Sequence, residues 1–214
     1  MKIDFHVHTG HSPDSLIRVA DLMRKSKALG VIPVLADHYS IGAHAEARKL
    51  GMRFIPGEEI LTDKGDLIGL YVSDLIPKNT PFMEAMDRIH EQGGLACLPH
   101  MFDYRRPSSH ATEEEAAKAD IIEVFNARCL GQSLNDRAAE FAAKHGKPGA
   151  VGSDSHFLFE FGTTYAEMPE FDIENPWLLL RSLPQAKLVK KSAPFYVRGT
   201  TSMIFAAKRL LRRV

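Results

Sequence analysis

The chain has 214 residues, of which 44% are hydrophobic and 25% are charged, as in an average soluble globular protein and unlike a disordered one. Lys plus Arg and Asp plus Glu both number 27, so the net charge is zero and no global field favours nucleic acid or an anionic membrane. Two cysteines cannot build a disulfide framework and fit a reducing compartment. Without a signal-peptide pattern or a run of about 18 apolar residues, we expect a soluble, cytoplasmic protein.

Short apolar runs alternate with helical patterns along most of the chain. In chain order, the sequence predicts a strand at 2–7, a helix at 15–29, a strand at 31–36, a helix at 43–50, strands at 53–55 and 66–72, a helix at 81–92, strands at 95–98 and 121–125, a helix at 134–145 and a strand at 150–151. Repeated strand–helix units imply parallel strands, because each crossover must return to the same edge. The predicted fold class is therefore α/β, as a complete or distorted barrel.

The C-terminal part is less regular than the rest of the chain. Four prolines break its pattern before a final predicted helix at 202–213: Pro169, Pro176, Pro184 and Pro194. We expect one domain over residues 1–214, with a motif-bearing core at 1–165 and a less regular part at 166–214.

Side chains able to bind metal ions gather where the predicted strands end. They come from five separate strand ends: His6 and His8, Asp37 and His38, Glu58 and Glu59, His100, and Asp154 and His156. The carboxyl ends of the strands of a parallel barrel meet on one rim, which is where such folds place their chemistry. The sequence therefore predicts that these side chains converge on one site.

The spacing of the first pair explains why metal is the expected ligand. His6 and His8 occupy alternate strand positions and face the same way, about 6.5 to 7 Å apart along the strand. A metal ion between them can take both nitrogens at about 2.0 to 2.1 Å. Carboxylates neutralise the charge of the ions and bridge pairs of them that lie about 3.5 to 4 Å apart. The pattern indicates a site with more than one metal ion.

Five ordered stretches resemble the motifs of the PHP (polymerase and histidinol phosphatase) domain family: DFHVHTGHSPDS, LADH, IPGEEI, LPH and GSDSH, across residues 4–156. GDLIGLYV, EQGGLACLPHMFDYRR and IEVFNARCL also resemble small stand-alone members of the family. The resemblance implies a distorted, TIM-like (β/α)7 barrel with the metal site at the carboxyl ends of its strands. It also implies a phosphoesterase with two to three divalent metal ions, Zn, Mn or Fe.

Matched motif by motif, the resemblance implies three groups of metal ligands: His6, His8, Glu59 and Asp154 for a first ion, Glu59 and His100 for a second, and Asp14, His38 and His156 for a third. Glu59 is preferred to Glu58 because the family pattern is Gly-x-Glu. The family commonly adds a histidine to the second ion, but the corresponding window, FNARCL, has none. Cys129 is a strong ligand in that window and Asn126 a weaker one, and the sequence leaves open which of them completes the site.

The expected activity is hydrolysis of a phosphate ester by a water that the ions activate in a dinuclear or trinuclear centre. Asp154 and His156 are the candidates for passing a proton to the leaving alkoxide. The guanidinium groups of Arg105, Arg106 and Arg128 are the candidates for holding phosphate, because their forked geometry matches its oxygens. The substrate is expected to be a small phosphorylated metabolite, a nucleotide or a nucleic-acid end.

Two other functions compete with this one. The same rim could hydrolyse a C–N bond, as similar-looking amidohydrolases do, although no lysine stands at a predicted strand end to bridge two metals. The chain could also be a non-catalytic accessory module, a function that the nearly complete ligand set disfavours. Neither a membrane nor an obligate protein partner is expected.

Overall fold

The computed structural model describes residues 1–106, 110–197, 200, 203–204, 206 and 208. Its strands are β1 (Lys2–Val7), β2 (Val31–His38), β3 (Ile55–Thr62), β4 (Gly65–Leu70), β5 (Leu95–Leu98), β6 (Ile121–Asn126), β7 (Gly149–Gly152), β8 (Tyr165–Glu167) and β9 (Lys187–Val189). Its α-helices are α1 (Val19–Leu29), α2 (Gly42–Lys49), α3 (Phe82–Glu91), α4 (Glu113–Ala116), α5 (Gln132–Lys144) and α6 (Pro176–Ser182). Short 3₁₀ turns cover Leu183–Gln185 and Phe195–Val197.

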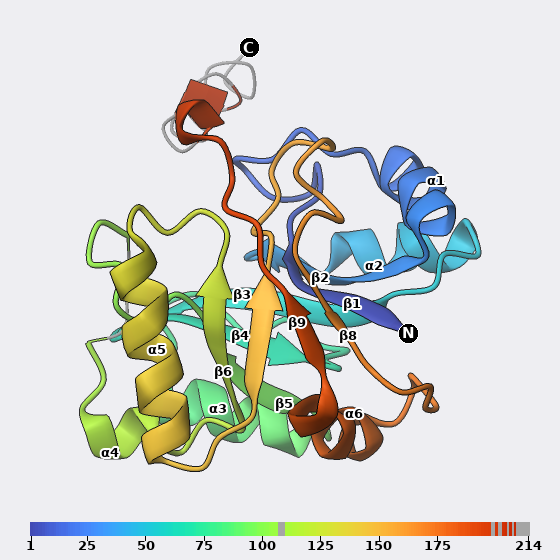
Figure 1. The fold of residues 1–214 in the computed structure, drawn as a ribbon. Coiled ribbons are helices and arrows are strands. Elements are labelled where there is room, and N and C mark those ends of the chain that lie inside the picture. Colours follow the sequence, from blue (N-terminus) through green and yellow to red (C-terminus); the bar gives the residue numbers. More distant parts are fainter. Residues whose placement is uncertain (107–109, 198–199, 201–202, 205, 207, 209–214) are drawn as a thin grey trace.

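The strands form one curved sheet in the order β7-β6-β5-β4-β3-β2-β1-β8-β9, with the helices outside it (Figure 1). Neighbouring strands from β1 to β3 and from β5 to β7 run parallel. Val7 pairs in parallel with Ser155, just beyond β7, so the two ends of the seven-stranded part nearly meet. The expected α/β barrel is confirmed, and its distortion is visible as incomplete closure.

The expectation of parallel strands throughout is wrong for β4, which runs antiparallel to both β3 and β5. β3 continues to Thr62, well past the predicted strand at 53–55, and only Asp63 and Lys64 separate it from β4. A connection this short can join only antiparallel strands. Glu58 and Glu59 consequently lie inside β3 rather than beyond its end.

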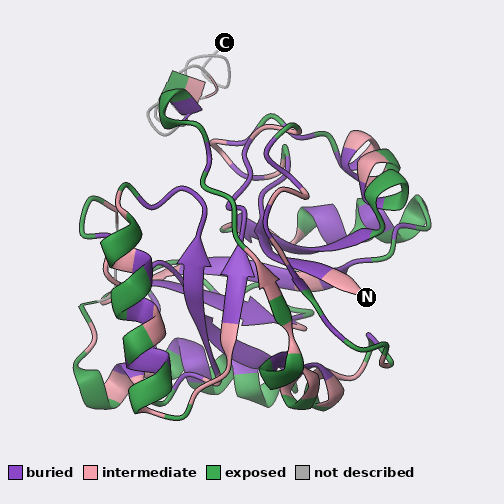
Figure 2. Ribbon diagram, in the orientation of Figure 1, coloured by how far each residue is buried: buried purple, intermediate pink, exposed green. Residues whose placement is uncertain are grey.

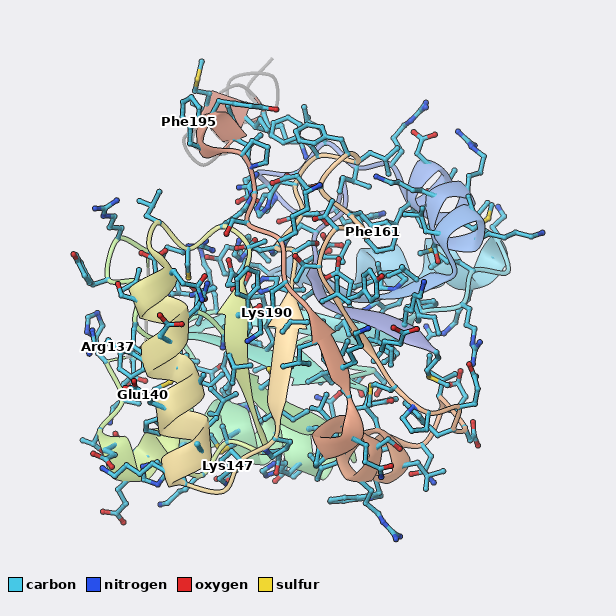
Figure 3. All side chains as sticks on the ribbon, in the orientation of Figure 1. Arg137, Glu140, Lys147, Phe161, Lys190 and Phe195 are labelled. Atoms are coloured by element: carbon cyan, nitrogen blue, oxygen red, sulfur yellow. The ribbon has the colours of Figure 1, made fainter. Side chains whose placement is uncertain are left out.

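The helices are buried along the sides that face the sheet and exposed along their outer sides (Figure 2). In α3 the buried residues Phe82, Ala85, Met86 and Ile89 follow the spacing of one helix face. Residues Arg137 and Glu140 of α5 point away from the sheet (Figure 3). A buried apolar layer therefore lies between the sheet and its helices.

Irregular chain follows β1 where a helix was expected from residue 15. α1 begins only at Val19, so residues 8–18 form a loop that carries Asp14. Lys208 ties the C-terminal segment to this loop, because its ammonium group donates to the carbonyl oxygens of Gly10, Ser12 and Ser15 at 3.1, 2.8 and 2.6 Å. Most of the helix expected at 202–213 lies outside the described residues.

The C-terminal part adds two strands to the sheet. β8 pairs antiparallel with β1, and β9 pairs antiparallel with β8, so this part extends the sheet on the β1 side.

Within the part of the chain that the structure describes, no helix has the length and apolar character that a membrane span requires.

A glycine at the end of β7 allows the close approach of β1, and this gives a first prediction. A Cβ at Gly152 would overlap with the Cβ of His6 and with Oε1 of Glu123. We expect Gly152→Ala to lower the free energy of unfolding by about 1 to 3 kcal/mol, measured in urea, because overpacking forces the strands apart. In the control Gly10→Ala the nearest atom is Ile17 O at 3.6 Å, and equal stability losses in the two variants would contradict the packing argument.

Candidate metal centre

Glu59 lies at the centre of a group of imidazole rings inside the barrel rim. Its Oε2 lies 3.2 Å from His6 Nε2, 3.3 Å from His8 Nε2 and 3.2 Å from His38 Nδ1. Its Oε1 lies 3.0 Å from His100 Nε2. Burial raises the pKa of the Glu59 carboxyl, but the charges of His6 and His38 and a hydrogen bond from His100 outweigh burial and hold that pKa well below its usual range. Four imidazoles from three segments thus share one carboxylate.

His6 and His8 direct their Nε2 atoms at each other, 3.0 Å apart. Oδ1 of Asp154 lies 3.4 Å from His8 Nε2 and 3.9 Å from His6 Nε2. Ligands of a tetrahedral metal ion at about 2.0 to 2.1 Å are themselves about 3.3 to 3.4 Å apart. The donor atoms are therefore already spaced as ligands of one ion would be.

Hydrogen bonds on the far side of two rings fix which nitrogen faces the centre. Glu123 Oε1 lies 3.1 Å from His6 Nδ1, and its Oε2 accepts the backbone N–H of His100 at 2.8 Å. Nδ1 of His156 lies 2.9 Å from the carbonyl oxygen of Asp154. Metal-binding histidines are commonly oriented by such partners. Glu123 was missed from the sequence because it lies inside β6, where no strand-end signal marks it.

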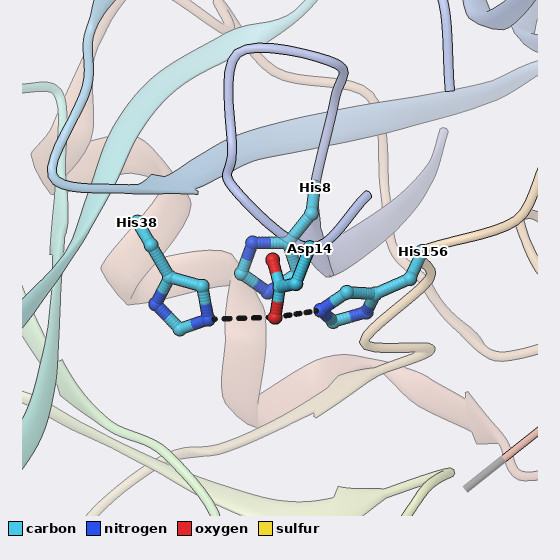
Figure 4. Close-up of side chains that lie close together, drawn as sticks. All are labelled: His8, Asp14, His38 and His156. Carbon is cyan, nitrogen blue, oxygen red and sulfur yellow. Dashed lines mark hydrogen bonds and ion pairs between the residues drawn. The ribbon is translucent and has the colours of Figure 1, made fainter. Parts of the chain in front are cut away.

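A second cluster lies beside the first and is built around the loop after β1. Oδ2 of Asp14 lies between His156 Nε2, at 3.0 Å, and His38 Nε2, at 3.6 Å, with the ring of His8 next to them (Figure 4). Burial raises the pKa of the Asp14 carboxyl, but hydrogen bonds from His156 and His38 lower it by more. The pKa of Asp14 therefore lies below its ordinary value. The structure thus brings a residue of an irregular loop against two strand-end histidines.

The donors fit divalent metal ions by number and by chemistry. Among the described residues, four groups bring their ligand atoms within 4.8 Å of one another: His8, Asp14, His38 and His156; His6, His100 and Asp154; His6, His8 and Glu59; and Glu59, Asp66 and His100. Imidazole nitrogens and carboxylate oxygens are ligands that Zn, Mn and Fe accept. The close approach of the His6 and His8 nitrogens is also relieved by a cation that both can ligate.

Asp66 is part of the centre although sequence reasoning did not select it. It stands in β4, 4% exposed, and its carboxylate groups with those of Glu59 and His100. Burial raises the pKa of Asp66 to about 7, and the negative charge of Glu59 adds to that effect. The available signal was an acidic residue within the apolar run GDLIGL.

The three arginines selected from the sequence occupy different environments. Arg106 forms an ion pair with Asp154, and its Nη2 donates to Asn126 Oδ1 at 3.4 Å, so its guanidinium lies at the centre. Arg105 is exposed on the same loop. Arg128 is buried and its guanidinium binds both carboxylate oxygens of Glu160, at 2.9 and 3.0 Å. Its phosphate-binding role stays a prediction.

The two alternative ligands for the second ion also differ in placement. Asn126 donates from Nδ2 to Glu123 Oε2 at 3.1 Å and to Asp154 Oδ2 at 3.2 Å, which puts its amide beside the centre. Cys129 is buried, and within the described part of the chain it belongs to none of the candidate metal-binding groups. Burial raises the pKa of its thiol to about 12.

Unusual backbone conformations occur at three points of the rim. Tyr39, His100 and Asp154 have φ angles of 57°, 27° and 51°, in the region that favours glycine. Such conformations cost about 1 to 3 kcal/mol each and persist where the surroundings determine them. Two of the three residues are candidate metal ligands, and Tyr39 directly follows a third, His38. Three of the five non-glycine residues with such angles among the described residues thus lie at this site, the other two being Tyr71 and Asn79.

The fold and the site define an α/β barrel with a buried histidine–carboxylate centre on its rim. A family model described as PHP-associated matches residues 132–188. The chain is 40% identical over 182 residues to the uncharacterised protein MJ0417 of Methanocaldococcus jannaschii, which covers 82% of this chain and 74% of that protein. The chain belongs to the PHP domain family.

Solved structures agree on the fold. A two-domain protein of Bacteroides vulgatus, containing a predicted PHP-like metal-dependent phosphoesterase, has a TM-score of 0.70 and 19% identity. The match covers 89% of this chain but only 65% of that one, less than two thirds of its length. An amidohydrolase of Chromobacterium violaceum, solved with bound sulfate, has a TM-score of 0.62 and 17% identity over 84% of this chain and 95% of that one. At these identities the likeness concerns the barrel.

Metal binding should stabilise the folded chain, because the donor positions do not exist in the unfolded state. At about 100 times its dissociation constant, Mn²⁺ or Zn²⁺ should add about 2.7 kcal/mol, or roughly 5 to 11 °C in melting temperature. Differential scanning fluorimetry measures this shift, which His6→Ala should abolish or strongly reduce. His90→Ala is the matched control, because His90 is on the outer surface beside Asp120 at 2.8 Å. An undiminished shift in His6→Ala would contradict the site.

Proposed function

We propose that this protein is a metal-dependent hydrolase of phosphate esters. The observation that carries the proposal is the convergence of imidazole and carboxylate donors from separate strands on Glu59. The similar Bacteroides vulgatus protein contains a predicted PHP-like metal-dependent phosphoesterase, which supports the same activity. Membership of the PHP family makes hydrolysis the expected reaction type.

Two of the ion positions follow from the clusters. The first ion would be held by His6, His8, Glu59 and Asp154, and the third by Asp14, His38 and His156. Bound Zn, Mn or Fe ions would supply charge neutralisation for phosphoryl oxygens and a lowered pKa for water. We propose two to three divalent ions in total, with Glu59 shared between the first ion and a second that His100 also binds.

The protein's own side chains would orient the ester and manage the proton. Asp154 and His156 stand on the same short segment after β7, facing the two clusters. We assign them the role of holding or passing the proton that the leaving alkoxide needs. Because His156 Nδ1 is engaged by a backbone carbonyl, its Nε2 is the nitrogen left for this task or for an ion.

Arg106 is the best-placed residue for binding phosphate. Its side chain is 24% exposed, so it reaches from solvent to the ion pair with Asp154. Nε lies 3.3 Å from Asp103 Oδ2, which holds the guanidinium in place. Arg105, exposed on the same loop, would help to attract an anion. The Chromobacterium violaceum structure, which shares the fold, was solved with bound sulfate, a tetrahedral oxyanion like phosphate.

The substrate classes proposed are a small phosphorylated metabolite, a nucleotide or a nucleic-acid end. A C–N bond is the second candidate, and the observation that favours it is the likeness to the Chromobacterium violaceum amidohydrolase along nearly its whole length. No obligate protein partner is proposed.

The activity itself is the first test. With Mn²⁺ bound, we expect hydrolysis of p-nitrophenyl phosphate or bis(p-nitrophenyl) phosphate, and no cleavage of p-nitroacetanilide. His8→Ala and Asp154→Asn should each lower kcat/KM by at least about 100-fold, since loss of even outer partners costs about 10- to 100-fold. A loaded protein that cleaves the anilide and neither ester would establish the amidohydrolase alternative, and one that cleaves none of the three would favour an accessory module.

The second test concerns Arg106. Removal of a charge-assisted hydrogen-bond donor costs about 1.5 to 3 kcal/mol, so Arg106→Ala should lower kcat/KM by roughly 10- to 100-fold, mainly through KM. Arg88→Ala is the control, because Arg88 pairs with Glu84 on the outer face of α3 at 2.7 Å. Steady-state kinetics with the better ester measures both. Equal KM values for Arg106→Ala and the unaltered protein would reject the assignment.

A further inference from the structure

The second ion position has two clear donors, Glu59 Oε1 and His100 Nε2, which lie 3.0 Å apart. Two protein ligands are fewer than a metal ion in a protein usually takes. The residue window expected to supply the next ligand contains Cys129, which stands outside the candidate metal-binding groups of the described residues. A further ligand for this position must therefore come from another side chain near Glu59 and His100.

The β3–β4 hairpin places Asp66 there. In its register, Glu59 is opposite Ile68 and Leu61 is opposite Asp66. Residues opposite each other share a face, and so do residues two apart along a strand, so Asp66 lies on the same face of the sheet as Glu59. Its ligand atom is within 4.8 Å of those of Glu59 and His100.

The carboxylate of Asp66 has no direct partner among the described side chains, and the charges of His100, His38 and Arg106 offset its burial only in part. It is 4% exposed, and in the described part of the chain no hydrogen bond or ion pair reaches its side-chain oxygens. A carboxylate taken out of water without a donor is costly, and here the neighbouring charge of Glu59 adds repulsion. A divalent cation between the two carboxylates would lower both costs.

We propose that Asp66 completes the second ion position together with Glu59 and His100, and that neither Cys129 nor Asn126 ligates that ion. The inference rests on the proposed metal centre and names the composition of one of its sites. The resulting set has two carboxylates and one imidazole, where the family resemblance implies one carboxylate and two imidazoles.

This composition has a consequence for metal preference. Carboxylate oxygens suit Mn²⁺, whereas imidazole suits Zn²⁺ and other later ions. Exchange of one imidazole for a carboxylate should therefore lower the ratio of Zn²⁺ affinity to Mn²⁺ affinity at this position. The second position becomes the most oxygen-rich of the three, next to a third position with more histidines.

The experiment is a metal titration of three variants. Calorimetry measures the affinity for each ion, and elemental analysis after gel filtration counts the ions bound. Asp66→Asn should lose one equivalent of ion or weaken it by at least about tenfold, the lower limit for loss of an outer partner. Asp66→His should keep the equivalent and raise the ratio of Zn²⁺ to Mn²⁺ affinity. Glu58→Gln is the matched control, since Glu58 is equally buried but faces the other side of β3 and should keep every equivalent.

Cobalt spectra decide between Asp66 and the thiol without any activity measurement. A Co²⁺–thiolate bond gives charge-transfer absorption in the near ultraviolet, so the unaltered protein should lack this band and Cys129→Ser should bind as many ions as before. The band, a lost equivalent in Cys129→Ser, or a full count with undiminished affinity in Asp66→Asn would each overturn the inference. An unaltered protein that binds no metal would instead refute the proposed function itself.

Discussion

The whole site depends on one constraint: a carboxylate, Glu59, is buried inside the barrel among four imidazole rings at 3.0 to 3.3 Å. A buried charge is tolerated only where it is paired or ligates a metal. The barrel meets this condition because several of its rim segments contribute polar groups to the same small volume. The apolar faces of the strands, turned toward the helices, supply the burial that stabilises this arrangement.

The antiparallel β4 changes which chain ends reach that volume. In a purely parallel barrel only carboxyl ends of strands meet at the rim, whereas the turn after Thr62 brings the first residues of β4 there. Asp66 is the second residue of β4. It lies beside Glu59 because the short turn makes β4 run antiparallel to β3. The departure from parallel order and the acidic composition of the centre therefore have one structural cause.

Sequence reasoning succeeded where local geometry was enough. The first strand has the predicted bounds, and alternation along it places His6 and His8 on one face. It failed where partners come from strand interiors or from turn chemistry that was not recognised. Glu123 lies in the middle of β6, and Asp66 could be placed only once the direction of β4 was known. Contacts between such distant segments depend on tertiary packing, which periodicity does not encode.

The two clusters are held in place by different means. The first is fixed mainly by the sheet, since His6 and Glu59 lie within paired strands. The second depends on loops, and side-chain contacts hold these loops. Glu160 accepts the backbone N–H of His156 at 3.0 Å while Arg128 neutralises it, and Lys208 binds the carbonyls around Asp14. The buried arginine thus orders the second cluster whether or not it also contacts a substrate.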